Sequence, residues 1–281
     1  MADFTAQDVA ALRRATGAGM MDCKRALEET GGDVEAAKDW LRAQGITKQA
    51  KRSGRAAQQG AIDVAVDGSA GAVVELTCET DFVAKGADFR ELAADLARQV
   101  AERGDTDIES QPFEGSTVAD AVQALGAKLG ENVGVGRIAR YETADGLLDA
   151  YKHVQNERGT IGVLVELGGV DPSDAKARGI AHDVALHVAS AAPRYAGRDD
   201  VPADVVDHER KVLEELTRNE GKPEQAVPKI VEGRLNGFFK DNVLTEQPFI
   251  REPKTTVGKL VESLGADATI RRFVRFKIGE E

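Results

Sequence analysis

The chain has 281 residues, of which 42% are hydrophobic and 30% charged, which suits one large or two modest globular domains. Its formal net charge of −11 argues against nucleic-acid binding, because an acidic surface repels a polyanion unless a basic patch overrides it. No apolar run could span a bilayer and the N-terminus lacks the order of a secretory signal, so we expect a cytoplasmic protein without membrane contact.

The first 60 residues differ in charge from the rest. They carry 10 Lys and Arg against 8 Asp and Glu, which leaves 27 against 40 for residues 61–281. Three short amphipathic segments separated by glycines predict a three-helix domain over residues 1–47, followed by a basic linker over 48–60. The markers of the three segments are the candidate N-caps Thr5 and Asp33, the stretch Met21–Glu29, and the apolar positions Val9, Leu12, Ala36, Trp40 and Leu41.

Beyond residue 60 the sequence repeats itself. GAVVEL (71–76) matches GVLVEL (162–167), and TVADAVQALGA (117–127) matches TVGKLVESLGA (256–266). Each GxxVEL stretch is the second strand of a predicted hairpin, and each Thr-Val helix is followed by a β-branched strand. We therefore predict an α+β fold whose core consists of two repeated subdomains, residues 61–143 and 144–281. The other predicted strands are IDVAV (62–66), VGVGRIARYE (133–142), AYKHV (150–154) and ATIRRFVRFKIGE (268–280).

The second copy contains an insertion. Leu167 and Thr256 are 89 residues apart, against 41 for the corresponding Leu76 and Thr117. Apolar residues within 200–245 recur at helical spacing on both sides of GKP (221–223), which breaks a helix. We expect an antiparallel helical hairpin that projects as an arm, and the sequence leaves open whether the arm mediates self-association or contact with a partner.

Sequence patterns for catalysis, cofactor binding or metal binding are absent. Cys23 and Cys78 lie far apart, the four histidines form no zinc-binding pattern, and no phosphate-binding P-loop occurs. The glycines of GVGRIA (134–139) lie in a predicted strand instead of opening a helix, and GAGMMD (17–22) is more typical of a turn than of an anion site. His182 and His187, five apart on a helix, are interpreted as surface or core-edge residues. We expect no metal, no cofactor and no catalytic residue.

The stretch TCETDFVAKGADF (77–89) places Asp81 and Phe82 side by side where a predicted strand ends. An aromatic at the start of a helix is usually a core residue. The alternative is that Asp81 and Phe82 present a polar and an apolar group to a partner. The sequence leaves both interpretations open.

Three stretches resemble the bacterial translation elongation factor Ts family, the guanine-nucleotide exchange factors of elongation factor Tu. They are LRRATGAGMMDCKRALEETGGDVEAA (12–37), CETDFVAK (78–85), and VEGRLNGFF (231–239) with VLTEQPFI (243–250). The resemblance implies a domain like ubiquitin-associated (UBA) domains at the N-terminus, a core of two similar subdomains and a coiled-coil protrusion. Some members of the family continue into a further C-terminal helix, whose contacts are not carried over to this sequence.

The resemblance also implies site residues and a role. The Asp and Phe of the family's T-D-F-V motif meet the GTPase domain of elongation factor Tu and disturb its magnesium and phosphate sites. The implied partner-binding residues are Thr80, Asp81, Phe82 and Val83 in that motif, Arg13, Met20, Met21 and Lys24 in the N-terminal domain, and His153 in the second subdomain. The implied protein binds elongation factor Tu, binds no nucleotide directly and performs no covalent chemistry. Whether it or its complex forms a homodimer is left open.

Two rival interpretations remain. The N-terminal bundle and its basic linker suit an adaptor that binds a ubiquitin-like protein or the ribosome, with Lys48, Lys51, Arg52 and Arg55 as the basic contacts. An adaptor leaves the T-D-F-V motif and the arm without a role. An enzyme with an unrecognised site is the other alternative.

Overall fold

A computed structural model describes residues 4–44 and 55–280 of the chain. Helices and strands are both abundant, which confirms the predicted α+β class. By its internal contacts the chain divides into two compact units. The first unit comprises Met1–Ala61, Leu76–Leu92 and Asp107–Gly136, and the second comprises Ile62–Glu75, Ala93–Thr106 and Arg137–Glu281.

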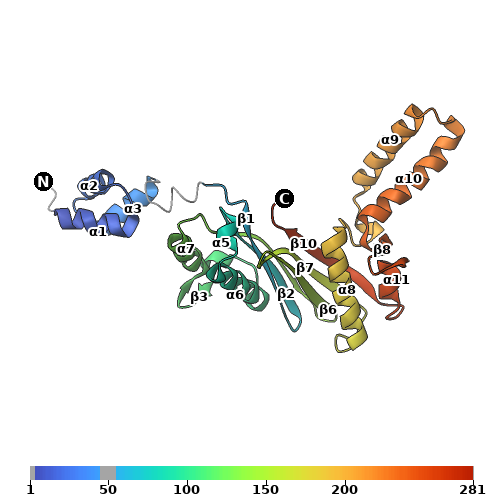
Figure 1. The fold of residues 1–281 in the computed structure, drawn as a ribbon, viewed down its shortest axis with the longest axis horizontal. Helices are drawn as coiled ribbons and strands as arrows, with labels where there is room; N and C mark the ends of the chain where they lie inside the picture. The colour runs from blue at the N-terminus through green and yellow to red at the C-terminus, as the bar shows by residue number, and fades with distance from the viewer. Residues whose placement is uncertain (1–3, 45–54, 281) are drawn as a thin grey trace. The chain divides into compact units, whose positions relative to one another are not determined.

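Three helices near the N-terminus enclose a core of their own (Figure 1). Thr5 caps the first helix through a capping box with Asp8, and Asp33 Oδ1 accepts the backbone N–H groups of Glu35 and Ala36, so both predicted caps are confirmed. The structure buries Ala37, whereas the predicted Ala36 is exposed in the first turn. The helices are α1 (Ala6–Thr16), α2 (Met20–Glu29) and α3 (Val34–Ala43).

A three-stranded sheet of order β1-β2-β5 follows the N-terminal helices. Its first strand begins at Gln59, three residues before the predicted one, so part of the predicted linker 48–60 is strand. Residues 48–54 of that linker lie outside the described residues. The elements here are β1 (Gln59–Asp67), β2 (Ala70–Cys78), α5 (Asp81–Ala84), α6 (Ala87–Arg103), η1 (Ile108–Ser110), β3 (Pro112–Phe113), β4 (Ser116–Thr117), α7 (Val118–Leu129) and β5 (Gly134–Glu142).

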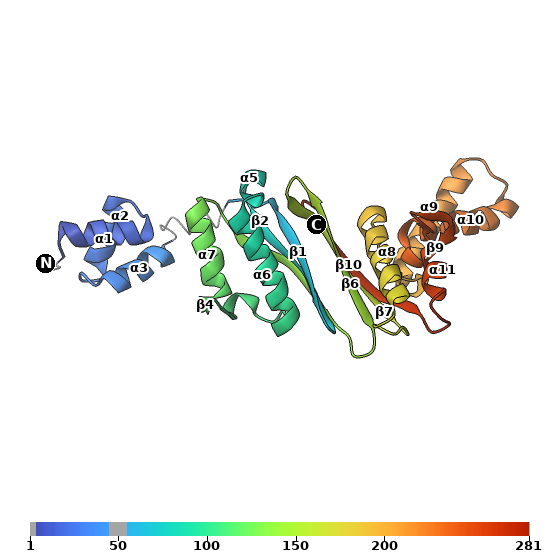
Figure 2. The same cartoon turned by 60° about the horizontal axis from the view of Figure 1, so that its bottom comes forward.

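A second three-stranded sheet has the order β10-β7-β6, and its strands are antiparallel. As in the first sheet, the second strand of the hairpin is central. Helix α8 packs on this sheet (Figure 2), and their contact buries Val163, Val165 and Val184 completely. The elements are β6 (Leu147–Gln155), β7 (Arg158–Gly168), α8 (Ala175–Ala191), η2 (Arg198–Asp200), η4 (Leu244–Glu246), β8 (Pro248–Phe249), β9 (Glu252–Thr256), α11 (Val257–Glu262) and β10 (Thr269–Lys277).

Within the second unit, strands of both sheets share one apolar cluster, which contains Ile62, Val73 and Leu164. Glycines on β7 allow this close approach. A Cβ on Gly162 would lie 2.4 Å from a methyl carbon of Ile62, and a Cβ on Gly159 would lie 2.0 Å from the backbone oxygen of Ile62. The backbones therefore meet where β7 has no side chain.

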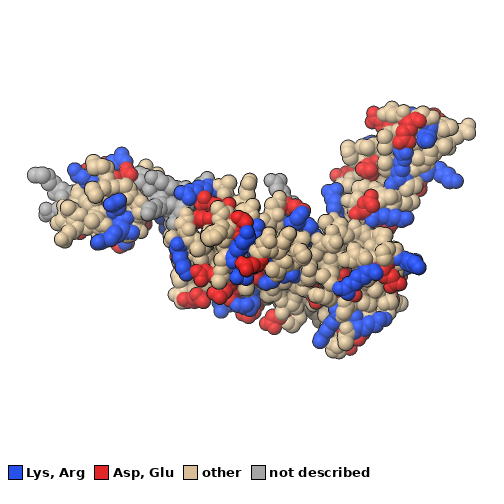
Figure 3. Space-filling model, viewed as in Figure 1, with Lys and Arg blue, Asp and Glu red and all other residues tan. Residues whose placement is uncertain are grey.

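The predicted insertion forms a helical hairpin in the second unit (Figure 1). Gly221, at φ +73°, provides the break between the helices, as the GKP motif predicted. Val205, Val206 and Leu213 pack against Leu235 and Phe239, and Figure 3 shows side chains of both charges over the visible face of the hairpin. The helices are α9 (Ala203–Asn219) and α10 (Val227–Asn242), with η3 (Glu224–Ala226) between them.

Candidate functional site

The T-D-F-V motif begins directly after β2 and forms the single turn α5. Thr80 is its N-cap: the backbone is extended, and the side-chain oxygen accepts the N–H of Val83 at 3.3 Å. The backbone oxygen of Thr80 accepts the N–H of Ala84 at 3.3 Å and the thiol of Cys78 at 3.1 Å. The local sequence thus converts a strand into a capped helical turn within two residues.

The ring of Phe82 is 83% exposed, so the interpretation of Phe82 as a core residue is wrong. Its neighbours Val83 and Ala84 are 8% and 0% exposed and anchor the turn. Leaving a Phe side chain in water forgoes roughly 1.5–3 kcal/mol of burial free energy. The alternative interpretation, that Asp81 and Phe82 face a partner, is therefore the one that the exposure of Phe82 favours.

Asp81 is also exposed and forms an ion pair with Lys85 one turn later, at 2.5 Å between Oδ2 and Nζ. We refer to Asp81 and Phe82 together as the tip. The tip therefore presents a carboxylate, partly neutralised by Lys85, beside an apolar ring.

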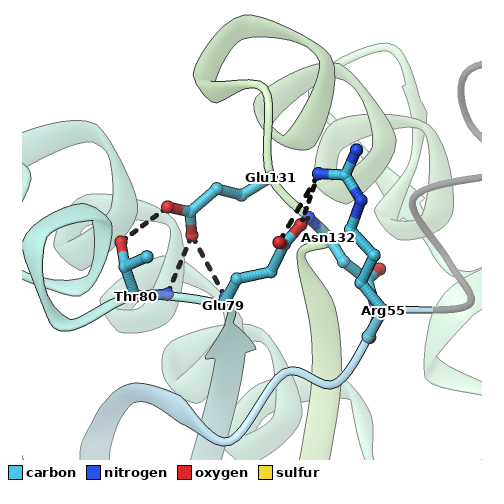
Figure 4. Close-up of polar contacts among 5 residues, drawn as sticks. All are labelled: Arg55, Glu79, Thr80, Glu131 and Asn132. Carbon is cyan, nitrogen blue, oxygen red and sulfur yellow. Dashed lines mark hydrogen bonds and ion pairs between the residues drawn. The ribbon is translucent and has the colours of Figure 1, made fainter.

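Two loops of the first unit hold the start of this turn (Figure 4). The carboxylate of Glu131 lies against Thr80, and the carboxylate of Glu79 lies against Asn132 and Arg55. Glu131 and Asn132 could not be identified from the sequence, because each lies more than 50 residues from its partner and no motif marks it. Of the basic residues proposed for an adaptor, Arg55 pairs with Glu79, while Lys48, Lys51 and Arg52 lie outside the described residues.

The N-terminal helices present a second candidate surface. Met20 and Met21, at the start of α2, are 59% and 72% exposed, and Arg13 and Lys24 are exposed as well. Arg13 and Met20 line one hollow of this bundle together with Arg14 and the Gly17–Gly19 turn. Lys24 forms an i,i+4 ion pair with Glu28 at 3.6 Å. The structure thus brings Arg13 and Met20 to one hollow, while Met21 and Lys24 are not among the residues that line it.

His153 lies on β6 in the second unit and is exposed. Its Nδ1 is 3.1 Å from the hydroxyl of Tyr151, and the strand has a register shift directly after it, between His153 and Val154. Val154 is 55% exposed, so the end of this strand shows both an imidazole and an apolar side chain.

His187 and the glycines of the GVGRIA stretch lie within the fold and form no candidate site. His187 is 1% exposed: its Nε2 lies 2.9 Å from Gln247 Oε1, and its Nδ1 accepts the N–H of Ile250 at 3.3 Å. Burial lowers the pKa of His187, because the charged form loses its hydration, although the bond to Gln247 opposes the shift. The glycines of the GVGRIA stretch lie in β5, as predicted.

The described part of the chain contains no cluster of three His, Cys, Asp or Glu residues arranged to hold a metal ion. Nor does any helix within residues 4–44 and 55–280 have the length and apolar character needed to cross a membrane.

Comparison with known proteins gives a consistent result. The family model described as "Elongation factor TS" matches residues 79–280. Proteins named elongation factor Ts from Thermobifida fusca and Streptomyces avermitilis are each 48% identical to the chain, over 285 and 287 residues. The protein of that name from Micrococcus luteus is 46% identical over 284 residues. These alignments cover 99–100% of the chain and 100% of each relative.

Proposed function

The chain belongs to the elongation factor Ts family, whose members act as nucleotide exchange factors for elongation factor Tu, and from this premise we propose how it acts. In this proposal the chain binds elongation factor Tu·GDP and promotes GDP release by disturbing the magnesium and phosphate site of that GTPase. The observation that carries the proposal is the 83% exposure of Phe82 on a capped and anchored turn.

The mechanism follows from how a GTPase holds its nucleotide. Most of the affinity for the nucleotide comes from backbone N–H groups of a phosphate-binding loop and from one magnesium ion that bridges the phosphates. A small displacement of these groups therefore loses much of the affinity. Burial of the Phe82 ring in the partner contributes roughly 1.5–3 kcal/mol toward that displacement. The Asp81 carboxylate would compete for donors or disfavour the magnesium geometry.

Exchange then follows from linkage. If the bound exchange protein lowers the affinity of elongation factor Tu for GDP by a certain ratio, bound GDP lowers the affinity for the exchange protein by the same ratio. GTP loading can follow once GDP has left. The proposed role requires no covalent chemistry, cofactor or nucleic-acid contact of this chain, and we place it in the cytoplasm, where translation elongation occurs.

We assign supporting contacts to the other surfaces. The N-terminal domain, residues 1–47, is proposed to be UBA-like and to meet the GTPase through Arg13, Met20, Met21 and Lys24, of which the two methionines are among the most exposed apolar residues described. Thr80 and Val83 act with the tip, but Val83 is 8% exposed and serves mainly to anchor it.

The core organisation belongs to the same proposal. We interpret residues 61–143 and 144–281 as related subdomains, which is supported by the common strand order of their sheets. The hairpin within 200–245 is an arm of the second subdomain, and His153 supplies a further contact.

Stopped-flow release of a fluorescent GDP from elongation factor Tu tests the proposal. Phe82→Ala is expected to slow release at saturating factor at least tenfold, because the ring is the wedge. Val66→Ala, at another exposed apolar side chain on β1 with 40% exposure, is the matched control and should release GDP at the wild-type rate. An unchanged rate for Phe82→Ala in a folded protein would refute the wedge.

A further inference from the structure

The turn that carries the tip is too short to hold its own shape. Helix α5 has 4 residues, and isolated helices of this length are unstable because the first turn fixes several dihedral angles for one hydrogen bond. Contacts from outside the turn must therefore set the direction of Phe82. Besides the buried Val83 and Ala84, Thr80 is a residue through which such contacts act, since it caps the turn and lies between the turn and β2.

Glu131 accepts three hydrogen bonds, two from Thr80 and one from the adjacent Glu79 (Figure 4). Its Oε1 accepts the Thr80 hydroxyl at 2.5 Å, and its Oε2 accepts the backbone N–H groups of Glu79 and Thr80, each at 3.1 Å. A threonine hydroxyl has a single proton, and an ionised carboxylate only accepts. The bond to Glu131 therefore commits that proton and leaves a lone pair of the same oxygen for the N–H of Val83.

The loop that carries Glu131 is itself fixed by hydrogen bonds to Glu79 and Arg55. It follows Gly130, which ends α7 at φ +78°, and precedes β5. The N–H of Asn132 donates to Glu79 Oε1 at 2.7 Å, and Asn132 Nδ2 donates to the backbone oxygen of Arg55 at 2.8 Å. Arg55 Nη1 completes the arrangement at 3.2 Å from Glu79 Oε1. The carboxylate of Glu131 thus accepts the backbone N–H groups of Glu79 and Thr80, and the carboxylate of Glu79 accepts the backbone N–H of Asn132.

From this geometry we propose that Glu131 is a positioning residue for exchange: it fixes the hydroxyl and backbone of Thr80 and so holds Phe82 in the direction that the partner requires. This inference rests on the proposed function, because the direction of the ring matters only if the ring acts on a partner. Glu131 acts through Thr80.

The test compares three variants in the fluorescent-GDP release assay. Glu131→Ala removes all three acceptor contacts and is expected to lower the release rate at saturating factor about 3- to 10-fold, the effect of losing a helix N-cap. Glu131→Gln keeps one carbonyl oxygen for the backbone N–H groups and should lose about 2- to 3-fold. Glu102→Ala, at an exposed glutamate in the last turn of α6, is the matched control.

Two further readouts separate positioning from a general loss of stability. The concentration of factor at half-maximal rate should change less than about twofold in Glu131→Ala, because the surfaces that supply affinity are untouched. Hydrogen exchange of the free protein should accelerate at the amides of Val83 and Ala84, while the exchange of α7 stays as in the control. If Glu131→Ala is unfolded at the assay temperature, Glu131→Gln decides by the same criteria.

The outcomes are distinguishable. Slowed release with Glu131→Ala and Phe82→Ala, together with faster exchange at Val83, supports the inference. Release at the rate of the Glu102→Ala control, while Phe82→Ala is slow, overturns the positioning role and leaves the proposed function intact. If Phe82→Ala also releases GDP at the wild-type rate, the proposed function fails, and amide exchange at Val83 alone then decides whether Glu131 orders the turn.

Discussion

Lys85 Nζ lies 2.5 Å from Asp81 Oδ2, so the carboxylate of the tip is paired with a cation of its own turn. Both side chains are partly exposed, and such pairs contribute only about 0.2–1 kcal/mol to stability. In the proposed mechanism the pair matters for charge, because Lys85 would offset the negative potential that Asp81 brings to the nucleotide site of the partner.

Lys85→Ala should therefore accelerate GDP release, by about two- to fivefold at low salt, because the Asp81 carboxylate loses the compensating charge of Lys85 and disfavours the magnesium geometry more strongly. The gain should shrink as salt screens the charge. Stopped-flow release at two ionic strengths measures both effects. Lys128→Ala, which removes an exposed ion pair with Asp88, is the control, and slower release with Lys85→Ala would contradict the assigned role of the charge.

The exposed methionines of α2 should contribute affinity and leave the release step unchanged. Replacing both Met20 and Met21 by Ala is expected to raise the half-saturating concentration of factor about 10-fold, since each buries an apolar side chain at the contact. The maximal release rate should stay within about twofold of the wild type. Glu29→Ala, on the same helix, is the control. A lower maximal rate at unchanged half-saturation would assign these methionines to the release step instead.

The space around Gly159 and Gly179 predicts opposite effects for an added Cβ at the two positions. Gly159→Ala should destabilise the protein by about 1–3 kcal/mol, because the new Cβ would lie 2.0 Å from a backbone oxygen that has little room to move. A Cβ added at Gly179, in α8, would meet no atom within 4 Å, so Gly179→Ala should stabilise by about 0.5–1 kcal/mol. Urea unfolding of both variants measures these changes. A harmless Gly159→Ala would show that the contact between β7 and Ile62 can relax at little cost.

Burial of His187 predicts a loss of stability in mild acid. Its pKa in the folded protein is lowered from the ordinary 6.5, so the unfolded chain takes up the proton first as the pH falls. The contribution of neutral, buried His187 to the free energy of unfolding is fully present above pH 6.5 and is lost progressively below it. The loss amounts to about 1.4 kcal/mol for each tenfold difference in proton affinity between the folded and unfolded states. Unfolding free energies at pH 7.5 and 5.5 should differ less in His187→Gln than in the wild type. A His208→Gln control should keep the wild-type difference, and an equal difference in all three proteins would refute the role of His187.

Local signals predicted the local structure well. Thr5 and Asp33 act as caps because a side-chain oxygen placed before an amphipathic segment can satisfy the first free N–H groups. The break at GKP and the GxxVEL strands could likewise be predicted, since turn residues and runs of β-branched residues determine backbone conformation within a few positions. Their exact ends were less predictable, as the earlier start of β1 shows.

Features that depend on distant residues could not be predicted. The direction of Phe82 depends on the cap at Thr80, and the order of that cap depends on Glu131, 51 residues further along the chain. Aromatic residues are most often found in the core, so composition favours a buried Phe82. The structure instead buries Val83 and Ala84 and leaves Phe82 exposed. His187 is a similar case, because its two ring nitrogens are hydrogen-bonded to Gln247 and Ile250, 60 and 63 residues further along the chain.

In the proposed mechanism, Phe82 couples binding of this protein to loss of GDP from elongation factor Tu. Calorimetric titration of elongation factor Tu, once with GDP and magnesium bound and once nucleotide-free, measures that coupling as the ratio of the two dissociation constants. The account predicts a large preference of the wild type for the nucleotide-free GTPase, and a ratio at least tenfold smaller for Phe82→Ala. An unchanged ratio in a folded Phe82→Ala protein would contradict it.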